Sequence, residues 1–119
     1  MGDAWSRKQT RELRELQGLA WERELEAALR TLRKDFDTWE QHEITPFELA
    51  DRVHKFHNGR SRELFVAYSG SLNVDWILRA IAVDVIDETE LSEDLHKVLE
   101  DDIASFRTRW AAAKPNRGA

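Results

Sequence analysis

Apolar residues recur at intervals of three and four along most of this chain, and this spacing restricts the fold more than any other feature of the sequence. Such intervals place side chains on one face of an α-helix, whereas a half-buried β-strand needs alternate residues. Glycine and proline, which interrupt helices, number only five and two among 119 residues. We therefore predict an all-α protein, a helical bundle of about five helices with a long N-terminal helix.

The length and the composition are typical of one folded domain. Hydrophobic residues make up 41% of the chain and charged residues 34%, a balance outside the range of disordered proteins. We predict a single helical domain over residues 1–119. Residues 1–20 are candidates for an N-terminal arm or a dimerisation extension, and residues 113–119 for a flexible tail.

The charge of the chain argues against two classes of partner. A formal net charge of −5 and a pI near 5.4 disfavour binding to the phosphates of nucleic acid and to anionic membranes. No stretch approaches the roughly 20 apolar residues of a membrane span, and the first residues contain no apolar signal segment. The absence of cysteine excludes disulfides and thiolate metal sites. We expect an acidic, cytoplasmic protein with no nucleic-acid or membrane partner.

The first predicted helix, from about Trp5 to Glu40, carries two apolar faces, and the sequence leaves open whether it continues through Gly18. One face, predicted to pack on the core, comprises Trp21, Leu25, Leu29, Leu32, Phe36 and Trp39. The other face comprises Trp5, Leu13, Leu16 and Leu19. One core cannot easily cover both faces, so we expect the second to form an interface with another copy of the chain, giving a homodimer, or with another protein.

The second predicted helix has the clearest start in the sequence. Thr45 is the expected N-cap, Pro46 the first helical residue, and Glu48 completes a capping box. Asn58-Gly59 is expected to end this helix near His57 by adopting a left-handed conformation. Three further helices are predicted: a short one from an N-cap at Ser61 to Tyr68, a central and most buried one from Val74 to Ile86, and a last one from Ser92 to Ala112.

Two histidines on the second helix are the first candidates for chemistry. His54 and His57 are three residues apart and fall within the apolar arc of the helix, a geometry that suits metal binding or acid–base catalysis. Alternatively, each ring is a core residue that hydrogen-bonds a carbonyl or a carboxylate. No third and fourth ligand lie nearby in the sequence, so we predict neither a metal site nor a cofactor. We expect both rings to be mostly buried.

Three further residues are candidates for binding. Asp84 falls among apolar positions, which predicts a buried carboxylate with a cationic or imidazole partner, either a catalytic histidine or a structural arginine such as Arg60 or Arg62. Alternatively, Asp84 lies at the end of its helix and reaches water. Arg60 and Arg62 precede the expected start of the short helix, where they could bind an anion together with the free N–H groups. Ordinary ion pairing with Glu63 is the alternative.

No nucleophile motif or glycine-rich phosphate loop appears in the chain. The favoured hypothesis is therefore a non-enzymatic helical interaction module that associates with itself through the N-terminal helix. The alternative is a small enzyme or a ligand- or anion-binding protein, whose pocket is lined by His54, His57, Arg60 and Asp84.

Overall fold

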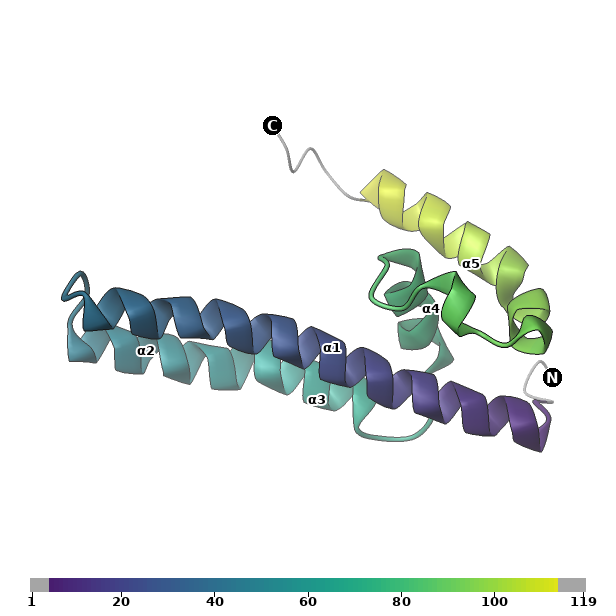
Figure 1. Ribbon diagram of the computed structural model, residues 1–119, viewed down its shortest axis with the longest axis horizontal. Helices are drawn as coiled ribbons and strands as arrows, with labels where there is room; N and C mark the ends of the chain where they lie inside the picture. The colour runs from purple at the N-terminus through teal and green to yellow at the C-terminus, as the bar shows by residue number, and fades with distance from the viewer. Residues whose placement is uncertain (1–4, 114–119) are drawn as a thin grey trace. The chain divides into compact units, whose positions relative to one another are not determined.

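The computed structural model describes residues 5–113 and confirms the all-α fold with its long N-terminal helix. The α-helices in this range are α1 (Arg7–Glu40), α2 (Pro46–Phe56), α3 (Arg62–Tyr68), α4 (Val74–Ala82) and α5 (Glu93–Ala113) (Figure 1). A π-helical turn, η1 (His57–Ser61), joins α2 to α3, and a 3-10 turn, η2 (Glu88–Glu90), precedes α5. The described residues contain no β-strand. The predicted tail lies outside them except for residue 113.

The chain divides into two compact units, whereas the sequence predicts a single domain. The described part of unit 1 comprises residues 5–20 and 72–113, and unit 2 comprises residues 21–71. Helix α1 contributes its first turns to unit 1 and the remainder to unit 2. Gly18 does not interrupt this helix.

Unit 1 has an extensive apolar core, drawn from the first turns of α1 and from α4, α5 and the turns around them. Its buried apolar residues are Leu13, Leu16, Ala20, Ile77, Leu78, Ala80, Ile81, Ile86, Leu91, Leu95, Leu99 and Ile103. Helix α4 supplies four of them from nine residues, in agreement with the prediction that this segment is strongly buried. It ends at Ala82, however, four residues earlier than predicted.

The interface predicted on the first turns of α1 is not an exposed surface. Leu13 is fully buried and Leu16 is 5% exposed, while Trp5 and Leu19 are half-buried. The prediction that these residues form an uncovered apolar strip is therefore wrong. The physical reason is that this face of the helix packs into the core of unit 1. The other apolar face, on the second part of α1, belongs to unit 2.

Unit 2 is a helical hairpin in which α1, from Trp21 onward, runs antiparallel to α2, η1 and α3 (Figure 1). The contacts that align the two arms are, from the tip toward the base, Asp35 with Arg52, Glu24 with Arg60, and Trp21 with Phe65. Its buried apolar residues are Leu49, Leu64, Ala67 and Tyr68. Unit 2 is therefore held together by contacts between its two arms rather than by an enclosed core.

Helix α2 begins as predicted and does not end as predicted. The Thr45 hydroxyl accepts a hydrogen bond from the Glu48 N–H, and the Glu48 carboxylate accepts one from the Thr45 N–H, which completes the capping box. Gly59, in contrast, is not left-handed, and Ser61 has helical dihedral angles with no side-chain cap. The backbone continues through the π-helical turn, so the free helix N-terminus expected after Ser61 does not exist.

Candidate functional site

The most unusual surface of the molecule lies on the hairpin. Six large apolar side chains of unit 2 are exposed: Leu29 (47%), Phe36 (40%), Trp39 (36%), Phe47 (87%), Phe65 (58%) and Val66 (69%). The first three belong to the stripe predicted to pack on a core, while Trp21, Leu25 and Leu32 of the same stripe are half-buried. The prediction is wrong for the exposed members, because a single opposing helix covers only part of the stripe.

Leu29 and Phe36, two of the exposed residues of α1, lie on one side of the hairpin. Consecutive residues of an α-helix are about 100° apart, so Leu29 and Phe36 project within about 20° of each other. Glu24 and Asp35 project in a direction roughly 120° away by the same arithmetic. Helix α1 therefore has an apolar side and a charged side, which flank the line along which it contacts the second arm.

The second arm has the same division. On α2, Ala50 projects roughly 160° away from Arg52, and on α3, Phe65 projects roughly 140° from Arg60. Since these arginines pair with the carboxylates of α1, the charged sides of both arms coincide. We define the apolar side of the hairpin as Leu29, Phe36, Ala50 and Phe65, with His57 at its edge.

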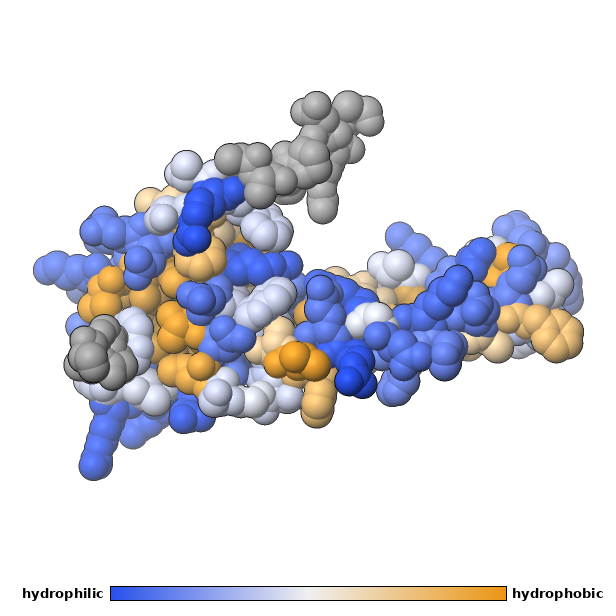
Figure 2. Space-filling model, turned by 180° about the vertical axis from the view of Figure 1, so that it is seen from behind, coloured by the Kyte–Doolittle hydropathy of each residue, from blue (hydrophilic) through white to orange (hydrophobic). Residues whose placement is uncertain are grey.

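The charged side of the hairpin is satisfied within the chain. The Glu24 side chain is only 4% exposed, and its carboxylate accepts hydrogen bonds from Arg60 at 2.8 Å and from the Tyr68 hydroxyl. Arg60 also donates to Glu63, which confirms the ion-pairing alternative for this arginine. A buried carboxylate needs such partners, since removing one would leave an uncompensated charge. In the view of Figure 2, hydrophilic side chains cover most of the hairpin at the right, with hydrophobic atoms at its edges.

The two histidines predicted to be buried are exposed. His54 Nε2 lies 3.0 Å from the side-chain nitrogen of Asn58, an amide rather than the expected carbonyl or carboxylate. The prediction of burial is wrong because the apolar arc that both rings share is open to solvent on the hairpin. His57 and Arg62, both predicted binding residues, line a surface pocket of about 280 Å³ together with Asn58, Ser61 and Phe65.

Asp84 has the predicted kind of partner in an unexpected setting. Its carboxylate oxygen lies 3.3 Å from Nη1 of Arg107, which confirms a cationic partner. The prediction of burial is wrong, and the alternative that Asp84 reaches water at the end of its helix is confirmed, because the side chain is 78% exposed. Helix α4 has ended before this residue, and Asp84 adopts a left-handed conformation with φ of 63° in the following turn. Asp84 belongs to unit 1, whereas His54, His57 and Arg60 belong to unit 2.

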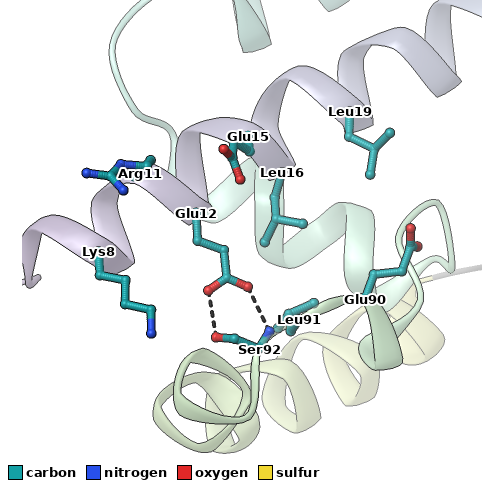
Figure 3. Close-up of a pocket in the computed structure, with 9 residues that line it drawn as sticks. All are labelled: Lys8, Arg11, Glu12, Glu15, Leu16, Leu19, Glu90, Leu91 and Ser92. Atoms are coloured by element: carbon teal, nitrogen blue, oxygen red, sulfur yellow. Dashed lines mark hydrogen bonds between the residues drawn. The ribbon is translucent and has the colours of Figure 1, made fainter.

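A larger hollow of about 660 Å³ lies in unit 1 (Figure 3). Its lining comprises Lys8, Arg11, Glu12, Glu15, Leu16, Leu19, Glu90, Leu91 and Ser92. Both carboxylate oxygens of Glu12 are occupied, since one accepts from the Ser92 N–H at 2.7 Å and the other from the Ser92 hydroxyl at 2.6 Å. Ser92 in turn accepts from the Leu95 N–H at the start of α5. These contacts tie α1 to the beginning of α5 and assign Glu12 a structural role.

Unit 1 contains an ion-pair cluster that was not predicted from the sequence. The Glu88 carboxylate binds His96 Nε2 at 2.8 Å and Arg107 Nη2 at 2.7 Å. These bonds, the one to His96 foremost, hold the pKa of the Glu88 carboxyl below its ordinary value. No sequence motif indicates this cluster, because its members come from η2 and from two separate turns of α5.

Over the part of the chain that the structure describes, no group of three or more histidine, aspartate or glutamate side chains is placed to hold a metal ion. Within the same range, the helices lack the combination of length and hydrophobicity needed to cross a membrane. Comparisons of the chain with protein-family models, with curated proteins and with solved structures found no match.

Proposed function

We propose that this protein is a non-enzymatic helical interaction module whose binding surface is the apolar side of the hairpin. The observation that carries this proposal is the asymmetry of unit 2, where one side is closed by internal ion pairs and the other exposes Leu29, Phe36 and Phe65. The proposal keeps the N-terminal helix as the site of association but moves the surface from Leu13 and Leu16 to the second part of α1. It also keeps the cytoplasmic location predicted from the sequence.

The energetics of a two-helix hairpin support this proposal. Amphipathic helices are stabilised mainly by packing of their apolar faces, and one neighbour covers only part of a wide face. Complete burial of a leucine or phenylalanine stabilises by roughly 1.5 to 3 kcal/mol before the cost of ordering. Leu29 and Phe36 are 47% and 40% exposed, so a partner that covers both gains about 1 to 3 kcal/mol from the two together. A third and fourth helix would complete the bundle that the hairpin begins.

The ligand-binding alternative has less in its favour. The surface pocket of about 280 Å³ that His57 lines includes none of His54, Arg60 and Asp84 in its lining. Arg60, which the alternative requires as a ligand, is engaged by Glu24 and Glu63. We therefore favour the interaction module.

Two double variants test the proposal. Leu29→Glu with Phe36→Glu places two charges on the apolar side of α1, and Ala27→Glu with Thr31→Glu places two charges on exposed positions of the same helix, away from that side. Association is measured by light scattering for the purified chain and by co-purification for other proteins, with circular dichroism to follow helicity.

We expect the first pair to keep its helicity and to lose an association that the second pair retains. Equal association of both double variants and the wild type would contradict the proposal. Unfolding of the first double variant alone would instead assign Leu29 and Phe36 to a core.

A further inference from the structure

We infer that the partner of the apolar side is a second copy of this chain, and that the two hairpins pack with their tips at the same end of a four-helix bundle. This inference rests on the proposed function and specifies its partner. The symmetry of the surface, the charges beside it and its area support this partner.

Symmetry restricts how the apolar side can meet itself. Two identical hairpins can pack these sides together about a two-fold axis in only two ways. If the axis runs along the helices, α1 of each copy lies against the α2–α3 arm of the other, and both tips are at one end. If the axis crosses the helices, α1 lies against α1 and the tips are at opposite ends.

The charges that border the apolar side differ between the two arms. By the helical arithmetic used above, the border on α1 comprises Glu22, Glu26, Arg33, Asp37 and Glu40, which are all exposed and mostly acidic. The border on the other arm comprises His54, His57 and Arg62, which include no acid. Packing α1 against α1 would bring two mostly acidic borders together, whereas packing α1 against the other arm places each acidic border beside one whose fixed charge is the guanidinium of Arg62.

The levels of these residues along the hairpin agree with the arrangement in which α1 packs against the α2–α3 arm of the other copy. A two-fold axis along the helices preserves the level of every residue. Within one copy, the pair Glu24–Arg60 and the pair Trp21–Phe65 bracket the level of Glu22, which by interpolation lies near Glu63, about one residue from Arg62. In the dimer, Glu22 therefore lies within about one residue of the level of Arg62 of the second copy.

The levels of the other charged residues that border the apolar side can be found in the same way. Interpolation between the pairs Glu24–Arg60 and Asp35–Arg52 places Glu26 near the level of Asn58, one residue from His57. Arg33 is the exception in the acidic border of α1, and by the same interpolation it falls near the level of His54.

The area of the apolar side is sufficient for a dimer. The hairpin portion of α1 spans about 20 residues, or about 30 Å, and two packed helices are about 20 Å wide. Each copy therefore covers about 600 Å² of the other, about 1,200 Å² in total, which is the lower limit of specific, stable interfaces. This size predicts a dimer that dissociates on dilution.

Distances between spin labels distinguish the two arrangements. The chain contains no cysteine, so Glu43→Cys at the exposed tip and Ser69→Cys at the exposed base each provide a single attachment point. Pulsed electron paramagnetic resonance then measures the tip-to-tip distance in one labelled variant. The tip-to-base distance comes from a mixed sample whose variants carry spectroscopically distinct labels. Both measurements are repeated with Leu29→Glu and Phe36→Glu added.

We expect the tip-to-tip distance to be the shorter of the two, by more than about 10 Å for arms about 30 Å long, and both couplings to vanish in the Leu29→Glu, Phe36→Glu background. A shorter tip-to-base distance that also vanishes in this background would overturn the inferred arrangement and leave the proposed function standing. Absence of coupling at millimolar concentration would overturn the second copy as partner. Coupling that survives in the charged background would overturn both proposals, because the chains would then associate through another surface.

Discussion

Glu88 shows how a single carboxylate connects separate parts of unit 1. It lies on η2 and binds His96 and Arg107, which are three turns of α5 apart. The lowered pKa of Glu88 means that its ionised form is favoured by folding. Its contribution to stability is present above the ordinary carboxyl pKa of about 4.3 and is lost as the pH falls through the lowered value.

We therefore expect Glu88→Gln to lower the free energy of unfolding at pH 7 by up to about 1 kcal/mol, the range of partly exposed ion pairs. The difference from the wild type should shrink as the pH falls below about 4, where the wild-type carboxylate becomes protonated. Urea unfolding at pH 7 and pH 3 measures both values, with Glu100→Gln, an exposed acid on α5, as the control. A difference that is the same at both pH values would show that the charge of Glu88 is not involved.

Residue patterns also show what the sequence could predict about the site. Periodicity places His54 and His57 among apolar residues of the second predicted helix, and it places Leu29 with Phe36 on one face of α1. It could not show whether another element covers those sides, because coverage depends on contacts between segments far apart in the chain. The same limit explains why Leu13, which is fully buried, was predicted to lie at an interface.

Among the elements, the arm formed by α2, η1 and α3 departs most from its prediction. Its start was predictable because the capping box involves only Thr45 and its neighbours. Its end was not, because Asn58-Gly59 permits a left-handed cap without requiring one, and packing along α1 favours continuation. The helix accommodates the change of register through the π-helical turn.

The sign of the stability change caused by one substitution tests whether the helix continues through Gly59. Gly59 has no positive φ, and a Cβ atom added there would meet nothing within 4 Å. We expect Gly59→Ala to raise the free energy of unfolding by about 0.5–1 kcal/mol, because alanine restricts the unfolded chain and favours helix. Thermal or urea unfolding measures the change, with Gly18→Ala in α1 as a helical reference. Destabilisation by Gly59→Ala would mean that a left-handed cap ends α2 after all.

At the scale of the whole molecule, the two units differ in how completely they bury their apolar residues. Unit 1 combines three helices around side chains such as Leu13, Ile77 and Leu99, which are all fully buried. Unit 2 has two arms and leaves Phe36 and Phe65 exposed. The all-α class followed from the sequence, whereas this division did not, since both units draw on the same long helix.

The mass of the wild-type chain in solution tests the central claim most directly. Sedimentation equilibrium over a range of concentrations should give a mass that rises from 13.9 kDa toward twice that value. The Leu29→Glu, Phe36→Glu variant should stay at 13.9 kDa with its helicity retained. A wild-type mass of 13.9 kDa at every concentration up to the millimolar range would contradict the claim that the apolar side of the hairpin binds a second copy.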